Sequence, residues 1–317
     1  MSSIRSVILG AASALLAGAA VAAPPLLSPA ELQPLLRSAS VRVIDIREPK
    51  AYAEKRIPGS VSAPYAEWRG PAANPGELPD LPKLTALVQR LGLTPATHAV
   101  VVSSGADATD FGAAARVYWS LKVLGLKELS VLNGGVKAWA QAGLAQDAVN
   151  VSLTPSGFSP SIDKSLIATR DEVKAQIESG KGRLVDSRPA DFFSGDTRHQ
   201  AAKLPGTLKG AVNLEHSRWF ATGSSSLVAP EEVRRIAASL PPASGDADTV
   251  SFCNTGHWAA TNWFALSEVA GQKNVKLYAG SMVDWTQNPL AALMDNVPSR
   301  AKQLAIDARL WAERTVK

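Results

Sequence analysis

The sequence repeats itself in order, and this duplication limits the folds open to the chain more than any other feature. Residues 43–49 and residues 184–189 both read as apolar residues followed by Asp, one further residue and Arg. The other two matched pairs are residues 59–63 with residues 210–214, and Trp139 with Trp285, each after a turn of small residues. Three landmarks in the same order predict two copies of one domain.

Each copy alternates short β-branched or apolar segments with segments of helical periodicity. This alternation is typical of an α/β fold, a mostly parallel sheet covered by helices on both faces. The predicted strands are residues 41–46, 99–102, 129–132, 183–186, 249–253 and 275–278. The predicted helices are residues 81–91, 113–124, 169–179, 230–238 and 259–269.

The domain boundaries follow from the repeats and from composition. Prolines, glycines and serines gather in residues 146–163, which indicates a linker. We therefore expect a first domain at residues 25–145 and a second at residues 164–290. The charged residues 291–317 predict a helical tail that packs back on a domain.

The N-terminus resembles a secretory signal. Arg5 precedes an apolar stretch at residues 7–20, and Ala20-Val21-Ala22 is a small-x-small cleavage site. We expect residues 1–22 to be removed and the protein to be periplasmic or secreted, with no membrane association after cleavage. The alternative is an N-terminal membrane anchor, for which the stretch is short.

Composition excludes several classes of function. The formal net charge of +5 is spread along the chain without a basic run, so nucleic acid is not expected. No pair of histidines and no Cys-x-x-Cys motif has metal-ligand spacing, and no Gly-x-Gly-x-x-Gly or phosphate loop is present. We therefore expect neither a metal nor a cofactor. A monomer is expected because a tandem pair supplies its own inter-domain cleft.

Cys253 is the one cysteine of the chain, and it follows a predicted strand and opens a short loop before a predicted helix. Backbone N–H groups in such a loop lower a thiol's pKa and stabilise anions, so a nucleophile fits this position. The alternative is a buried cysteine that acts as a small hydrophobe. The spacing of the Trp pair maps Cys253 onto Asp107, so the first copy carries no thiol. Asp186 and Arg188 end another strand of the same copy, and they should converge with Cys253 at the carboxyl edge of the sheet.

These motifs resemble the rhodanese family of sulfurtransferases in its tandem, exported form. The resemblance covers about residues 25–290 and rests on the strand-end Asp-x-Arg of both copies, the Pro-Gly-Ser at residues 58–60, the small-residue turn before each Trp, and the Cys-x-x-Gly loop. It implies two tandem rhodanese-like domains. Members of this type similarly carry an Asp in the thiol-free domain.

The resemblance also implies a reaction. Cys253 would attack the outer sulfur of a small-molecule donor such as thiosulfate, hold it as a persulfide, and pass it to cyanide or a thiol. Arg188 would face the anionic end of the donor, with Arg198 in place of a second arginine that relatives carry at the position of Phe192. The loop residues that would cradle the persulfide are Asn254, Thr255, Gly256, His257 and Trp258.

Two further functions fit the same residues. One is 3-mercaptopyruvate sulfurtransferase, in which Arg188 and Arg198 would hold the donor carboxylate. The other is a persulfide carrier or binding protein without turnover. For His257, a cationic or acidic role stands beside a solvent-facing one, and His216 is expected at the rim of the site. Asp186 is expected to be structural.

Overall fold

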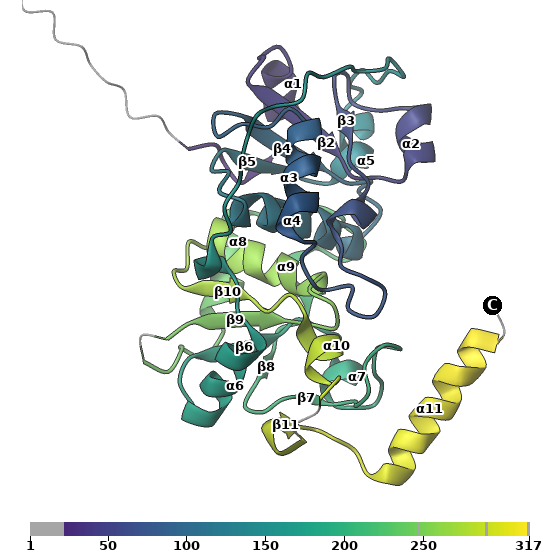
Figure 1. The fold of residues 1–317 in the computed structure, drawn as a ribbon, viewed down its shortest axis with the longest axis vertical. Helices are drawn as coiled ribbons and strands as arrows, with labels where there is room; N and C mark the ends of the chain where they lie inside the picture. The colour runs from purple at the N-terminus through teal and green to yellow at the C-terminus, as the bar shows by residue number, and fades with distance from the viewer. Residues whose placement is uncertain (1–21, 246, 289–290, 316–317) are drawn as a thin grey trace, which may run out of the picture.

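The computed structural model describes residues 22–245, 247–288 and 291–315, and it contains two α/β domains stacked end to end (Figure 1). The predicted signal peptide lies outside the described residues, apart from Ala22. Within the described part of the chain, no helix has the length and apolar character that crossing a membrane requires. The same residues contain no cluster of three or more side chains suited to a metal ion.

The first domain is built on a parallel sheet of order β1-β5-β4-β2-β3. Its strands are β1 (Leu26–Leu27), β2 (Val41–Asp45), β3 (Val61–Ser62), β4 (His98–Val102) and β5 (Leu129–Leu132). Its helices are α1 (Pro29–Leu35), α2 (Pro49–Glu54), η1 (Tyr65–Trp68), α3 (Leu81–Arg90), α4 (Ala108–Val123) and α5 (Gly135–Gln141).

The second domain repeats this plan with a parallel sheet of order β10-β9-β6-β8. Its strands are β6 (Arg183–Asp186), β8 (Val212–Asn213), β9 (Thr249–Phe252) and β10 (Val275–Leu277), with a separate antiparallel pair, β7 (Thr207–Leu208) and β11 (Met294–Asp295). Its helices are η2 (Lys164–Leu166), α6 (Arg170–Ser179), α7 (Ala190–Phe193), η3 (His216–Trp219), α8 (Pro230–Ala238), α9 (Trp258–Trp263), η4 (Phe264–Val269), α10 (Ser281–Trp285), η5 (Ala291–Leu293) and α11 (Arg300–Thr315). The predicted fold class is confirmed.

The register of the sheets aligns the ends of their central strands. Asp45 pairs with Val102 in the first domain, and Asp186 pairs with Phe252 in the second. Cys253 therefore leaves the sheet beside Asp186, as the strand-end argument predicts.

The two domains meet along α4 and α9, and one hydrophobic cluster runs through both of them. Most of α4 is buried, because one side covers the first sheet and the other packs on the second domain. This helix begins at Ala108, five residues before the predicted start, since the Asp107 side chain accepts a hydrogen bond from the N–H of Asp110 and caps it.

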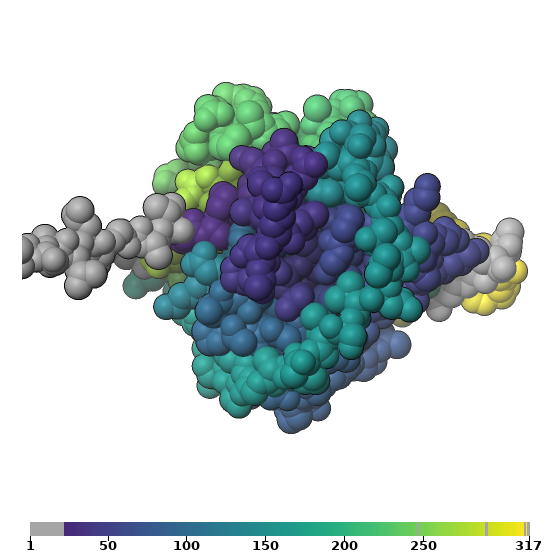
Figure 2. Space-filling view, turned by 90° about the horizontal axis from the view of Figure 1, so that it is seen from above, coloured from purple at the N-terminus to yellow at the C-terminus, as the bar shows by residue number. Residues whose placement is uncertain are grey.

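The linker and the tail lie on the outside. Residues 146–163 run over the first domain (Figure 2), and Val151, Leu153 and Phe158 pack on its core. The tail forms α11, which lies beside the second domain (Figure 1). Ile306 and Leu310 are its buried residues, and Asp307 pairs with Arg198 (2.7 Å).

Candidate active site

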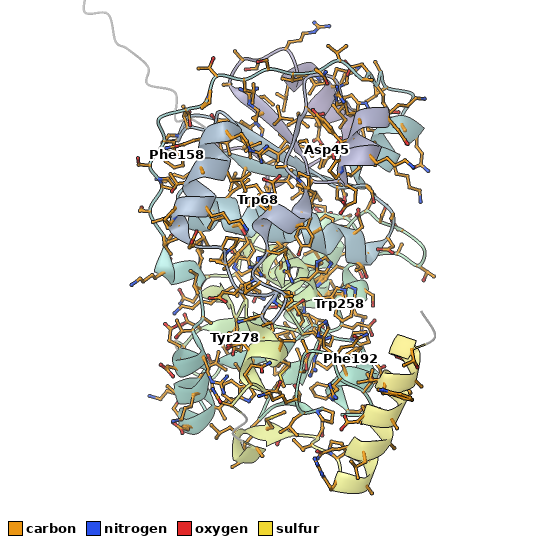
Figure 3. The ribbon with its side chains drawn as sticks, turned by 45° about the vertical axis from the view of Figure 1, so that its right-hand side comes forward. Asp45, Trp68, Phe158, Phe192, Trp258 and Tyr278 are labelled. Atoms are coloured by element: carbon orange, nitrogen blue, oxygen red, sulfur yellow. The ribbon has the colours of Figure 1, made fainter. Side chains whose placement is uncertain are left out.

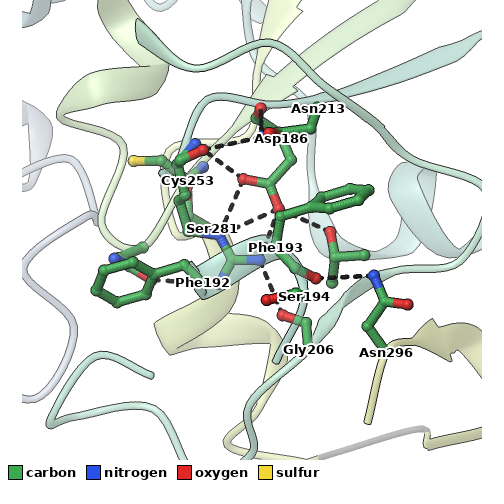
Figure 4. A network of polar contacts seen from close by, with 12 residues as sticks. Asp186, Phe192, Phe193, Ser194, Gly206, Asn213, Cys253, Ser281 and Asn296 are labelled. Atoms are coloured by element: carbon green, nitrogen blue, oxygen red, sulfur yellow. Dashed lines mark hydrogen bonds and ion pairs between the residues drawn. The ribbon is translucent and has the colours of Figure 1, made fainter. Parts of the chain in front are cut away.

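Cys253 lies where the chain leaves the carboxyl end of β9. Its side chain is 1% exposed, and in Figure 4 the sulfur points away from the carboxylate of Asp186. The loop of residues 253–257 then leads into α9 at the boundary between the domains. The thiol is therefore buried in the protein but lies close to the first domain.

The hydroxyl of Ser281 fixes the shape of this loop. Its Oγ accepts hydrogen bonds from the N–H groups of Cys253 (3.0 Å) and Gly256 (3.1 Å), and it donates to the carbonyl of Tyr278 (2.8 Å). Gly256 has a φ of 66°, and a Cβ atom there would lie 2.4 Å from the carbonyl oxygen of Ala279. Glycine suits this tight curl, because it adopts a positive φ without the strain that a side chain would add.

Two arginines of the first domain hold the carbonyl groups of the loop. Arg69 Nη2 donates to the carbonyl of Thr255 (2.9 Å), and Arg116 Nη1 donates to that of Gly256 (3.4 Å). Burial lowers the pKa of Arg116 to about 9, so it remains a cation at neutral pH. The N–H and C=O of a trans peptide point in opposite directions. These contacts therefore turn the N–H groups of Gly256 and His257, which share peptide units with the two carbonyls, away from the arginines.

Several N–H groups of the loop are left free. Among the described residues, those of Asn254, Thr255, His257 and Trp258 have no acceptor, whereas that of Gly256 is bound to Ser281. The expected cradle therefore contains four free amides rather than five. Free N–H groups in succession form a concave site for an anion, so this loop can stabilise a thiolate or a persulfide.

A pocket of about 230 Å³ lies against the sulfur side of this loop. Its lining residues are Arg69, Thr109, His199, Cys253, Asn254, Thr255, His257 and Trp258. Two of them, Arg69 and Thr109, belong to the first domain. The lining contains one permanent cation and no carboxylate, which favours an anionic ligand.

His257 is half-buried, and its ring is neutral and hydrogen-bonded at both nitrogens, so neither the expected cationic or acidic role nor a freely solvent-facing position fits it. Its Nε2 lies 2.7 Å from the carbonyl oxygen of Thr109, and its Nδ1 lies 2.8 Å from the hydroxyl of Tyr65. Burial and the nearby Arg69 lower its pKa to about 4, so the ring is neutral at pH 7. A carbonyl only accepts, so Nε2 carries the proton and Nδ1 accepts from Tyr65. His257 therefore ties the Cys253 loop to the first domain.

Arg188 does not face the pocket, which corrects its expected role. Its Nε and Nη2 contact the Asp186 carboxylate at 2.9 and 2.6 Å, and Nη2 also donates to the carbonyl of Gly206 (2.8 Å). Both partners of this pair are almost completely buried. Within the described part of the chain, the one contact of the guanidinium with the loop is to Asn254 Oδ1, 3.5 Å from Nη1. Asp186 has the structural role expected of it, and Arg188 shares that role.

Arg198 is also used elsewhere in the fold. Its Nη1 donates to the carbonyl of Ala202 (2.6 Å), and its Nη2 pairs with Asp307 of α11. The expected substitution for a second donor-binding arginine is therefore wrong, because the guanidinium supports its own loop and anchors the tail. The adjacent His199 lines the pocket instead.

Trp258 forms an aromatic wall of the pocket at the boundary between the domains (Figure 3). It stacks on His216 with ring centroids 4.7 Å apart, meets Phe192 edge-on at 6.1 Å, and directs Nε1 to Thr109 Oγ1 at 3.3 Å. His216 lies behind this wall and is buried, so it does not form the rim. Burial lowers its pKa.

The residue that corresponds to Cys253 in the first domain is Ser103, not Asp107. Cys253 and Ser103 each follow the last residue of a strand. The Cys253 carbonyl accepts from the N–H of Met282 (3.1 Å), and the Ser103 carbonyl accepts from the N–H of Val136 (2.9 Å). Both donors lie one residue after the small-residue turn of their own domain. The first copy has four more residues between this point and its turn, so the spacing of the Trp pair does not hold there.

Sequence reasoning missed the three basic side chains that surround the loop, which are Arg69, Arg116 and His199. Arg69 and Arg116 belong to the other domain, and their separation from the loop residues they bind is 186 and 140 positions. The one signal was indirect: a mostly buried apolar helix that carries an arginine, Arg116, needs an acceptor for it.

Comparison with known proteins finds the family model described as "Rhodanese-like domain" twice in the chain, at residues 28–142 and 169–288. The thiosulfate sulfurtransferase of Pseudomonas aeruginosa is 29% identical over 275 residues, which cover 84% of this chain and 95% of that protein. The thiosulfate sulfurtransferase of Bos taurus is 30% identical over 240 residues, which cover 74% of this chain and 79% of that protein. Among solved structures, the 3-mercaptopyruvate sulfurtransferase from Leishmania major matches with a TM-score of 0.68 at 23% identity, over 82% of this chain and 73% of that chain.

Proposed function

The chain belongs to the rhodanese family of sulfurtransferases, and on that premise we propose that it is a thiosulfate sulfurtransferase with Cys253 as nucleophile. The observation that carries the proposal is the set of free N–H groups of Asn254, Thr255, His257 and Trp258 in the loop that begins at the sole thiol of the chain. Relatives named thiosulfate sulfurtransferase, at 29–30% identity, support thiosulfate as the donor.

The reaction has two balanced steps. The Cys253 thiolate attacks the outer sulfur of thiosulfate, a new S–S bond forms, and sulfite leaves with the electron pair of the broken S–S bond. Cyanide or a thiolate then attacks the outer sulfur of the Cys253 persulfide, and the thiolate of Cys253 returns as leaving group. Negative charge lies on or near the cysteine sulfur throughout, which is where fixed N–H dipoles lower the barrier.

Replacing the nucleophile tests this proposal. We expect Cys253→Ser to lose at least about a thousandfold in thiocyanate formation from thiosulfate and cyanide, because the hydroxyl does not ionise at neutral pH. Cys253→Ser should keep the far-UV circular dichroism and the melting temperature of the wild-type protein to within a few degrees. Mass spectrometry of the wild-type protein with thiosulfate, without acceptor, should find one added sulfur atom that a reductant removes.

The same assays separate the alternatives. Turnover with 3-mercaptopyruvate that exceeds turnover with thiosulfate would move the assignment to the other donor. A persulfide that forms but is not turned over by cyanide or by small thiols would favour a carrier. Activity retained in Cys253→Ser would contradict the proposal itself.

We also propose that the protein is exported to the periplasm or secreted, on the evidence of Arg5, the apolar residues 7–20 and the Ala20-Val21-Ala22 site. N-terminal sequencing of protein recovered from the extracytoplasmic fraction should begin at Ala23. Recovery of the intact N-terminus from the cytoplasm would contradict export.

A further inference from the structure

Arg69, a basic residue of the first domain, has a guanidinium N–H group without an acceptor among the described residues. It lies directly after η1 and lines the pocket that contains Cys253. Its Nη2 donates to the carbonyl of Thr255, but its Nη1 is buried and has no hydrogen-bond partner among the described residues. Arg69 as a whole is half-buried, but a buried donor atom without an acceptor is costly, so Nη1 points to an acceptor that comes from outside the protein.

The surroundings of Arg69 leave its charge uncompensated. No carboxylate pairs with it within the described part of the chain, and none lines the pocket. Its guanidinium lies over the ring of Tyr65, 5.3 Å from the ring centroid, which holds it in position without neutralising it. The positive charge is felt across the pocket, since it adds to burial in lowering the pKa values of His257 and His199.

His199 supplies a second donor from the opposite domain. The N–H of Ala201 donates to its Nδ1 (3.2 Å), and burial lowers its pKa, so the neutral ring carries its proton on Nε2. That nitrogen has no partner among the described residues, and the side chain lines the same pocket as Arg69. The pocket therefore offers a cationic and a neutral N–H donor beside the sulfur of Cys253.

We propose that Arg69, assisted by His199, binds the anionic end of the sulfur donor, so that the domain without a thiol supplies the donor-binding cation. This inference rests on the proposed function, and it gives Arg69 the role that the sequence assigned to Arg188. The ligand class is a small oxyanion, the sulfonate end of thiosulfate or the carboxylate of 3-mercaptopyruvate. The Arg69 contact to Thr255 ties this anion site to the loop that carries the nucleophile.

The first experiment measures anion binding without any sulfur transfer. Cys253 is alkylated at fixed pH with iodoacetate, which is anionic, and with iodoacetamide, which is neutral and nearly the same shape. We expect Arg69→Met to lower the iodoacetate-to-iodoacetamide rate ratio by about tenfold, Arg69→Lys to lower it less, and Arg90→Met to leave it unchanged. Arg90 is the matched control, since it is an exposed first-domain arginine paired with Glu67.

The second experiment is kinetic. Arg69→Met should raise the KM for thiosulfate by about tenfold or more and leave the KM for cyanide within about twofold, because cyanide enters after sulfite has left. The same measurements are repeated with 3-mercaptopyruvate as donor. The donor whose KM rises more in Arg69→Met is the one whose anionic group depends more on Arg69.

The outcomes separate the two claims. An unchanged alkylation ratio and an unchanged donor KM in Arg69→Met would overturn the role of Arg69 while leaving the Cys253 reaction intact. Equal slowing with both alkylating agents would also overturn it, because it would mean that Arg69 only shapes the loop. A wild-type protein that forms no persulfide would overturn the proposed function, and the alkylation ratio would still report on the anion site.

Discussion

His257 connects the two domains through both of its ring nitrogens. In the neutral ring, Nε2–H donates to the Thr109 carbonyl and Nδ1 accepts from the Tyr65 hydroxyl. Protonation would place a second N–H donor against the Tyr65 hydroxyl, next to the cation Arg69. Burial and the charge of Arg69 disfavour the protonated ring, and its pKa is lowered to about 4.

A pH dependence of stability follows at this residue. In the unfolded chain the histidine takes up a proton near pH 6.5, whereas in the folded protein it does so only near pH 4. Its contribution is complete above pH 6.5 and is lost as the pH falls through 4. We expect His257→Gln, which keeps an amide N–H for Thr109, to be less stable at pH 7. The difference from wild type should shrink by about 3 kcal/mol by pH 4.

Urea unfolding of both proteins at a series of pH values checks this expectation. The other described histidines are unchanged in the variant, so their titration cancels in the comparison. Stability curves for the two proteins that run parallel from pH 7 to pH 4 would contradict a neutral His257.

At the scale of elements, the two strand-loop-helix units share a frame but differ in what occupies the loop. In the first domain Asp110 accepts from the N–H of Gly105 (2.6 Å) and from the hydroxyl of Ser104 (2.8 Å). The Asp110 carboxylate therefore accepts the hydrogen bond of a loop N–H group that an external anion could otherwise bind. Counted from the start of each helix, the residue equivalent to Asp110 in the second domain is Ala260, which leaves the loop of Cys253 open to an anion.

This difference predicts that a thiol alone does not restore the first site. We expect Ser103→Cys in a Cys253→Ser background to stay below about 1% of wild-type thiocyanate formation, because a carboxylate already fills the loop and repels a thiolate. Adding Asp110→Ala should raise the rate at which iodoacetamide modifies the new thiol. Substantial sulfur transfer by the protein that still carries Asp110 would show that the loop carboxylate is not the obstacle.

At the scale of the whole molecule, the interface between α4 and α9 positions the site. Gly112 of α4 lies in close contact with the second domain, because a Cβ atom there would lie 3.0 Å from two ring atoms of His257 and 3.1 Å from its carbonyl oxygen. Lys122 and Tyr118 of α4 reach Glu268 of the second domain, at 2.6 and 2.7 Å. The domains therefore meet through close packing at one end of the helix and a polar cluster at the other.

A methyl group at Gly112 should disturb the site from the interface. We expect Gly112→Ala to push the His257 ring off the Thr109 carbonyl, lower stability by about 1–3 kcal/mol and reduce kcat/KM for thiosulfate several-fold. Gly157→Ala is the control, because nothing lies within 4 Å of a Cβ atom at that linker position. Differential scanning calorimetry and steady-state kinetics measure both effects, and equal behaviour of the two variants would mean that the interface tolerates the added volume.

Much of this architecture is determined by the sequence alone. The six predicted strands and five predicted helices all occur, because the alternation of apolar residues and the caps of helices act over a few neighbouring positions. Residues 129–132, 183–186 and 230–238 have the predicted bounds, the other elements differ by up to five residues at an end, and the last helix continues as a π-helix from residue 264. The duplication and the strand-end position of Cys253 followed from the same local patterns. The structural role of Asp186 was also foreseen, since a carboxylate at a strand end has loop N–H groups within reach.

The tertiary structure alone decided which charges face the sulfur. Arg188 follows a strand next to that of Cys253, yet its guanidinium is hydrogen-bonded to Asp186 and Gly206. Arg69 and Arg116 instead reach the loop from the other domain. Docking of one domain on another depends on the summed shape of two surfaces, and no local pattern of residues encodes it. For that reason the contacts of the first domain with the Cys253 loop could be found only in the folded protein.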